Sequence, residues 1–258
     1  MNYNILKKKI EQIKFEIILL IKKKYIVISI LLFSFNAFSQ GSFKGRVIYN
    51  ISYKKPNLEE YKKKKNDEEV RSRVIDMYNN TKDVKSTLLF NRYESLFKLE
   101  KKMSKSNKSE MNLTQFFAGN NEVNYYNLND QNIITQKELM GDYFLISKKQ
   151  KKWILTKETK KIGKYLCYKA EFLYKGGKPK RVKKIIAWFT EEIPISFGPR
   201  NYAGLPGLIL ELEDSKLIYK AIKVELGLKE KLKIEKPSKG KKISEENYLK
   251  FVKSISPF

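Results

Sequence analysis

Four glutamates lie on the two sides of a segment rich in glycine and proline, and their spacing could support chemistry. Glu191 and Glu192 precede the segment, and Glu211 and Glu213 follow it. Glu211 and Glu213 are two residues apart on a predicted strand, so both side chains project from one face. Two such carboxylates can act as a general acid and base, or they can bind one hard cation. The alternative is that they face solvent from a strand whose leucines form the buried face.

Histidine is absent from the sequence and cysteine occurs once, which excludes most other catalytic and metal sites. There can be no Ser-His-Asp triad, no Cys-His pair and no zinc site with histidine or several thiolate ligands. Cys167 is expected to be a small buried residue, with an intermolecular bridge or a nucleophile as the alternatives. A nucleophile pair of Ser196 and Lys184 has no support from spacing, because some lysine is near every serine. We therefore expect no catalytic residue and no cofactor.

The segment itself is the stronger candidate for a ligand-contact surface. Glycine and proline both fix backbone geometry, so their crowding predicts a loop of defined shape. Residues before proline are extended, and Pro206-Gly207 suits a type II turn with Gly207 at positive φ. The segment holds three glycines and three prolines: Gly198, Gly204, Gly207, Pro194, Pro199 and Pro206.

A preorganised loop of this kind can present side chains to a ligand with little loss of entropy. The candidate ligand-binding residues are Arg200, Asn201, Tyr202, Gly204, Leu205, Pro206 and Gly207. The alternative is a structural corner between two strands, in which Tyr202 is packed and Arg200 pairs with a nearby glutamate.

Alternating apolar residues predict a series of strands around this loop. The clearest are residues 43–53, 86–99 with a hairpin at Asn91-Arg92, 165–174, 182–190, 208–213 and 217–226; Phe116 and Phe117 are a short strand candidate. Helical spacing predicts one inserted helix within 58–79, and Ser244 caps a C-terminal helix with Glu245 and Glu246 in its first turn. Strands that follow one another closely favour antiparallel pairing. We predict a mainly β fold, a curved, half-barrel-like antiparallel sheet with one inserted and one C-terminal helix, in a single domain over residues 40–258.

Residues 1–39 have the pattern of an export signal. Lys22, Lys23 and Lys24 form a basic cluster, residues 25–35 are apolar, and small residues lead to predicted cleavage between Ser39 and Gln40. The alternatives are an uncleaved anchor or a true start downstream of Met1. We expect an exported protein that is periplasmic, outer-membrane-associated or secreted, with at most peripheral membrane association.

The chain is strongly basic, with 54 Lys and Arg against 28 Asp and Glu and a net charge of +26. Such a charge is typical of proteins with an anionic partner, such as nucleic acid, lipopolysaccharide or an acidic polymer. However, only six of the 54 basic residues are Arg, whose bidentate fork is preferred for reading phosphates. Codon bias is therefore the favoured explanation, and export makes nucleic acid an unexpected partner.

The stretch 187–213 resembles the signature of the GLPGLI family of exported bacterial proteins, and residues 204–209 spell the motif that names it. The resemblance covers roughly residues 43–226. It also includes Trp153, residues 160–165, Cys167, Ala170, residues 187–190, Ile193 and Pro194. The resemblance implies a periplasmic or envelope-associated protein of the Bacteroidetes type. It implies no catalytic residues.

These observations favour a non-catalytic envelope protein with a binding or assembly role. We expect the curved aromatic-rich sheet and the 198–207 loop to contact an apolar ligand, a peptide or an envelope protein. The alternatives are a hydrolase that uses the glutamates flanking the loop, and a cation-binding module.

Overall fold

The computed structural model describes residues 21, 22, 24, 43–55, 68–100, 112–175 and 182–255. The chain divides into two compact units, Met1–Phe43 and Lys44–Phe258, and the second contains all the elements named below. The predicted export signal and its cleavage site at Ser39 and Gln40 lie outside the described residues, apart from three helical residues of the first unit. None of the described helices is both long and apolar enough to cross a membrane.

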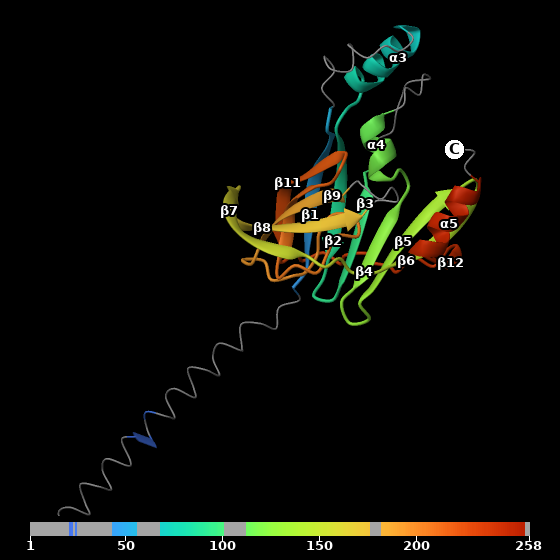
Figure 1. Ribbon diagram of the computed structural model, residues 1–258. Coiled ribbons are helices and arrows are strands. Elements are labelled where there is room, and N and C mark those ends of the chain that lie inside the picture. The colour runs from blue at the N-terminus through green and yellow to red at the C-terminus, as the bar shows by residue number, and fades with distance from the viewer. Residues whose placement is uncertain are drawn as a thin grey trace, which may run out of the picture. The chain divides into compact units, whose positions relative to one another are not determined.

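The described part of the second unit contains twelve strands and three helices (Figure 1). The first six strands are β1 (Gly45–Tyr53), β2 (Val84–Phe90), β3 (Glu94–Leu99), β4 (Val123–Asn127), β5 (Asn132–Leu139) and β6 (Asp142–Lys148). The others are β7 (Ile154–Ile162), β8 (Tyr165–Lys175), β9 (Val182–Thr190), β10 (Leu208–Glu213), β11 (Leu217–Leu226) and β12 (Lys241–Ser244). The helices are α3 (Glu68–Asn79), α4 (Leu113–Ala118) and α5 (Glu245–Ile255).

All twelve strands belong to one sheet, in the order β12-β6-β5-β4-β3-β2-β1-β11-β10-β9-β8-β7. Strands β1 to β6 form one antiparallel meander and β7 to β11 form a second, and the pairing of β1 with β11 joins them. The edge strand β12 pairs with β6 in parallel. The predicted mainly β fold with a large sheet is confirmed.

The sheet is curved and open, and its two ends approach a common space. Phe172 on β8 and Ile185 on β9 line the same pocket as Ser147 on β6 and Ser244 on β12, although these strand pairs stand at opposite ends of the order. Figure 1 shows β7 and β8 on one side of the central strands and β5, β6 and β12 on the other. A half-barrel of this kind has a concave face, and other segments of the chain must pack against it.

The loop between β9 and β10 packs against this face of the sheet. Phe197 is fully buried, and its ring contacts Phe90 on β2 at 6.5 Å and Tyr126 on β4 at 5.7 Å between centroids. The hydroxyl of Tyr49 on β1 donates a hydrogen bond to the Ile209 carbonyl at 2.6 Å. The loop is thus part of the hydrophobic core.

Two features of the fold were not predicted. Residues 116 and 117 belong to the helix α4, so the expected strand there is wrong and a second helix is inserted in the sheet. Local capping explains the helix: the Asn112 side chain accepts a hydrogen bond from Thr114 N, and Gly119 ends the helix at φ +85°. The parallel pairing of β12 with β6 was also not predicted. The closely spaced strands before β12 indicate antiparallel neighbours, and nothing in them indicates that residues 241–244 return to pair with β6.

The two predicted helices are present, with different amounts of contact. In α3, no described side chain is buried, and its ring contact with the sheet is a stack of Tyr78 on Tyr53 at 5.8 Å. In α5, Ser244 accepts a hydrogen bond from Asn247 N, as expected for an N-cap. Tyr248 of α5 packs on Phe144 and Ile146 of β6, which fixes the helix beside the edge of the sheet.

Candidate functional site

The glycine- and proline-rich loop is held in shape by its own backbone hydrogen bonds. Leu208 N donates to Ile193 O at 3.0 Å, Ile209 N to Phe197 O at 3.0 Å, and Gly204 N to Ser196 O at 3.1 Å. The indole of Trp153 donates to the Ala203 carbonyl at 2.9 Å. The loop is therefore a rigid platform, as its composition predicted.

Gly207 serves close packing rather than the predicted turn. Its φ is not positive, so the expected reason for glycine in a type II turn is wrong; the left-handed residues of the loop are Gly204, at φ +93°, and Arg200, at φ +54°. A Cβ on Gly207 would lie 2.1 Å from the Thr190 carbonyl oxygen. Gly204, Leu205, Pro206 and Gly207 do not line the pocket described below, and they act on it by fixing the loop.

Arg200 is held by a buried ion pair. Its Nη2 donates to the Glu122 carboxylate at 2.9 Å and its Nη1 donates to the Phe117 carbonyl at 3.3 Å. Glu122 is buried and also pairs with Lys137 at 2.8 Å. Burial alone would raise the pKa of Glu122, but Arg200 and Lys137 outweigh it and hold that pKa below its usual value. Arg200 therefore pairs with a glutamate, as expected if the loop is a structural corner.

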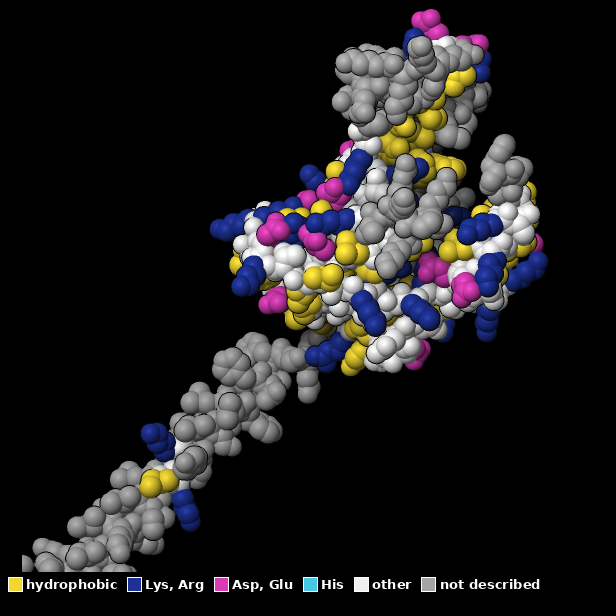
Figure 2. Space-filling model, in the orientation of Figure 1, with side chains coloured by type: hydrophobic (Ala, Val, Ile, Leu, Met, Phe, Trp, Pro, Cys, Tyr) yellow, Lys and Arg dark blue, Asp and Glu magenta, His cyan; other side chains and the backbone are white. Residues whose placement is uncertain are grey.

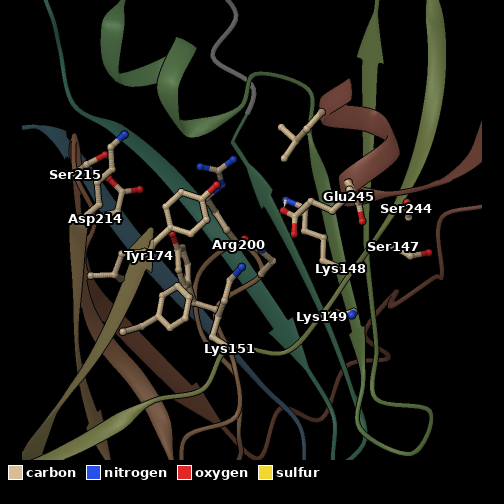
Figure 3. Close-up of a pocket in the computed structure, with 17 residues that line it drawn as sticks. Ser147, Lys148, Lys149, Lys151, Tyr174, Arg200, Asp214, Ser215, Ser244 and Glu245 are labelled. Atoms are coloured by element: carbon tan, nitrogen blue, oxygen red, sulfur yellow. Dashed lines mark ion pairs between the residues drawn. The ribbon is translucent and has the colours of Figure 1, made fainter. Parts of the chain in front are cut away.

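Arg200 nevertheless contributes to a pocket of about 800 Å³ in front of the loop (Figure 3). Arg200, Asn201 and Tyr202 form one part of its lining, so three of the seven candidate ligand-binding residues meet there. We call it the cationic pocket, because its charged lining is Lys148, Lys149, Lys151, Lys183 and Arg200 against Asp214, Glu245 and Glu246. The rest of the lining is hydroxyl-bearing, aromatic or aliphatic: Ser147, Ser215, Ser244, Tyr174, Phe172, Ile185 and Leu249.

The carboxylates of the cationic pocket are already occupied by protein groups. Asp214 accepts hydrogen bonds from the backbone N–H groups of Lys216 and Leu217, both at 2.8 Å. Glu245 pairs with Lys148 at 3.7 Å and Glu246 pairs with Lys250 at 2.8 Å. Figure 3 shows Asp214 and Ser215 on one wall and Glu245, Ser244 and Ser147 on the other.

Three lysines of the cationic pocket have no carboxylate partner among the described residues. Lys149, Lys151 and Lys183 form no ion pair with any residue that the structure describes, and Lys151 lies 5.6 Å from the Phe172 ring centroid. Figure 2 shows Lys and Arg spread over the visible face with acidic residues among them, rather than gathered in one patch. The ratio of basic to acidic side chains in the lining, five to three, is close to that of the whole chain, 54 to 28. The pocket is distinguished instead by three lysines without an ion-pair partner among the described residues.

Lys148 has a pKa well below that of an ordinary lysine. Burial lowers its pKa to about 8, repulsion from Arg200 and Lys151 acts in the same direction, and Glu245 and Glu122 oppose the shift. Its side chain is only 13% exposed. An additional anion beside Lys148 would favour its charged form.

A second pocket, of about 820 Å³, lies on the other side of Glu122. Its lining includes the end of β3 and the residues that follow α4, and its carboxylates are Glu100, Glu122 and Glu138. Glu122 lines this pocket while its partner Arg200 lines the cationic pocket, so the buried ion pair separates the two.

The candidate carboxylates around the loop do not line either of these pockets. Glu211 pairs with Lys160 at 2.8 Å, and Glu213 pairs with Lys54. Glu192 accepts a hydrogen bond from Leu166 N at 2.8 Å, and Glu191 is exposed. Among the described residues no group of three or more Cys, Asp or Glu side chains could hold a metal ion. Ion pairing accounts for Glu211 and Glu213 without a cation.

The other nucleophile candidates have protein partners or are buried. Cys167 is buried, and burial raises the pKa of its thiol to about 11, so it is not a thiolate at neutral pH. Lys184 pairs with Glu171 at 2.6 Å, while the Ser196 carbonyl serves the loop backbone. Neither residue lines the cationic pocket.

Sequence reasoning missed the lysines of the cationic pocket, because 48 lysines offer no contrast. One signal existed: Phe144, Ile146 and Lys148 alternate on β6, so Lys148 occupies a position where the strand pattern expects an apolar residue. Lys183 and Glu245 come from distant strands and helices, and only the curvature of the sheet brings them together.

Comparison with known proteins gives a family hint and a fold. A family model described as a protein of unknown function (Porph_ging), from a Bacteroidetes-associated family, matches residues 174–211, which span β9 and the loop. Two crystal structures of PNGF-II are similar at 16% identity, over 82% of this chain and 33% of theirs, with TM-scores of 0.50 and 0.48. The chain thus spans about a third of the length of PNGF-II, and the likeness concerns the fold alone. No curated protein matches the chain.

Proposed function

We propose that this protein is an exported, non-catalytic binding protein that holds a small organic anion in the cationic pocket. The observation that carries the proposal is that Lys149, Lys151 and Lys183 have no ion-pair partner among the described residues, whereas each of the three carboxylates already has a protein partner. A bound anion would offset the burial, and the repulsion from Arg200 and Lys151, that lower the pKa of Lys148.

The apolar part of the lining indicates that the anion also has a carbon skeleton. Phe172, Tyr174, Ile185 and Leu249 can pack against a carbon skeleton, while the lysines bind its charged end. The ligand expected from the sequence was apolar or peptide-like, or an envelope partner. An anionic group on such a ligand agrees better with this lining.

Removal of two unpaired pocket lysines should weaken anion binding by about tenfold. Each exposed or half-exposed charge contact contributes about 0.5–1 kcal/mol, and 1.4 kcal/mol corresponds to a factor of ten. The variant is K151A/K183A, and calorimetric titration with citrate and with inorganic phosphate at constant ionic strength measures the change.

The matched control is K157A/K161A, which removes the same charge from exposed positions on β7 outside the pocket. Equal loss in both double variants would mean that the affinity reports overall charge, and no binding by the unmodified protein would remove the proposal.

The affinity for citrate should fall as pH rises above about 8. The charged form of Lys148 binds the anion, and with the pKa near 8 it is lost between pH 7 and pH 9.5, whereas ordinary lysines stay charged until about pH 10.4. Loss of this one charged contact predicts about tenfold weaker binding at pH 9.5. In K148R the guanidinium stays charged, so its affinity should be constant over this range. A fall of the same size in K148R would place the titrating group elsewhere.

Export and membership of the GLPGLI type are part of the proposal. The N-terminal pattern of residues 1–39, the motif at residues 204–209 and the match to a Bacteroidetes-associated family support them. N-terminal sequencing of the protein from the periplasm or medium of a host should give Gln40 as the first residue. Recovery from the cytoplasm alone, with residues 1–39 attached, would contradict export.

A further inference from the structure

The amine of Lys148 lines the cationic pocket without a hydrogen bond to any described residue. Its ion-pair partner Glu245 is 3.7 Å away, which is beyond hydrogen-bond distance. Lysine normally keeps its ammonium in water, whereas here most of the side chain is buried and its end lines a cavity. A largely buried lysine whose amine opens into a cavity, without a hydrogen bond to any described residue, is a candidate for acting on a ligand.

The surroundings of Lys148 favour its neutral, nucleophilic form. Burial comes first, and the neighbouring Arg200 and Lys151 act in the same direction against the carboxylates of Glu245 and Glu122. Desolvation beside another cation is one of the ways in which proteins activate lysine for attack on carbonyl groups. At pH 8 about half of the Lys148 amine is unprotonated, against about 0.4% for an ordinary lysine.

We propose that Lys148 forms an imine with the carbonyl carbon of a small oxo acid bound in the cationic pocket, a 2-oxo acid being the simplest member of this class. The inference rests on the anion-binding function proposed above and extends it to a covalent step. The remaining pocket cations, Lys149, Lys151, Lys183 and Arg200, bind the carboxylate, and the amine reacts with the carbonyl group next to it.

The step is balanced without any oxidant or reductant. The nitrogen lone pair attacks the carbonyl carbon, and the electrons of the C=O π bond move to the oxygen, which takes up a proton. The carbinolamine then loses its hydroxyl group as water, the nitrogen gives up its protons, and a C=N bond forms. Glu245 is the group that can accept and return these protons, because its carboxylate lies 3.7 Å from the amine.

Reductive trapping tests the imine directly. The full chain is incubated at pH 8 with pyruvate and sodium cyanoborohydride, and the modified lysines are located by peptide mass spectrometry. We expect Lys148 to gain a carboxyethyl group at least about tenfold faster than any other lysine, because its neutral fraction is about 100-fold higher. Acetone, in which a methyl group replaces the carboxylate, should label Lys148 at least about tenfold more slowly.

Two variants make the result specific. In K148R the fast labelling should disappear while citrate binding persists, because the guanidinium keeps the charge but does not form imines. In K157R, which changes an exposed lysine of β7 outside the pocket, the labelling of Lys148 should continue.

Uniform slow labelling of all lysines by pyruvate, in protein that still binds citrate, would overturn the imine and leave anion binding intact. Absence of both labelling and citrate binding would overturn both proposals. Equal labelling of Lys148 by acetone and pyruvate would overturn the assignment to oxo acids.

Discussion

The variant E122A should unfold with a free energy about 3–5 kcal/mol lower than that of the unmodified protein. Glu122 is buried, with 4% of its side chain exposed, and its two oxygens pair with Arg200 and Lys137. Removing it leaves the Arg200 guanidinium buried without its carboxylate, and an uncompensated buried charge is costly. Urea unfolding followed by tryptophan fluorescence measures the difference at pH 7.

The matched control for this prediction is E138A, which removes an exposed glutamate of β5 from the same second pocket. It should change stability by less than about 0.5 kcal/mol. E122Q should lie between the two, since its amide oxygen can still accept from Arg200. An E122A protein as stable as the control would show that the buried ion pair does not organise the loop.

The cost of E122A should also depend on pH. The pKa of Glu122 is held below its ordinary value of 4.5, so the contribution of its charge is present above pH 4.5 and is lost as pH falls through the lowered pKa. The stability difference between E122A and the unmodified protein should therefore shrink in acid.

The variant G207A should lose about 3 kcal/mol. Its new Cβ would lie 2.1 Å from the Thr190 oxygen and 2.6 Å from the Thr190 carbonyl carbon, both of which are backbone atoms. Because no side chain can rotate away, β9 and the start of β10 have to separate, which is a case of overpacking. Urea or thermal unfolding measures the loss, and citrate binding by the folded fraction reports the position of the loop.

The control for this substitution is G141A. Gly141 has a positive φ of +84° but no atom within 4 Å of the added Cβ, so its cost is the left-handed backbone alone, about 1 kcal/mol. A loss in G207A no larger than in G141A would show that the close approach to Thr190 is relieved without strain.

The strands were predictable because their side chains alternate, and α5 because Ser244 caps it and its first turn is acidic. The short helix α4 was not predictable from Phe116 and Phe117, since its cause is the cap at Asn112 and the turn at Gly119. The glycines and prolines between β9 and β10 predicted a loop of defined shape. The reason for Gly207, close approach to another strand, depends on a partner that no local pattern identifies.

The candidate site was predictable in part. Arg200, Asn201 and Tyr202 were identified from the loop, and they do line the cationic pocket. The lysines opposite them were not, because charge and spacing alone cannot distinguish one of 48 lysines. Their meeting depends on the bend of the sheet, which brings β8 and β9 near β6 and α5, and bending is a property of the whole sheet.

The parallel pairing of β12 with β6 predicts that the cationic pocket is completed late in folding. Lys241 aligns with Phe144, so one wall of the site, with Ser244 and Glu245, is recruited from a distant part of the chain. Such contacts between remote segments form slowly, because a long loop must close first. A nascent chain lacking these residues would have the sheet and the loop but an open pocket, which would close only after synthesis and docking of the C-terminal helix.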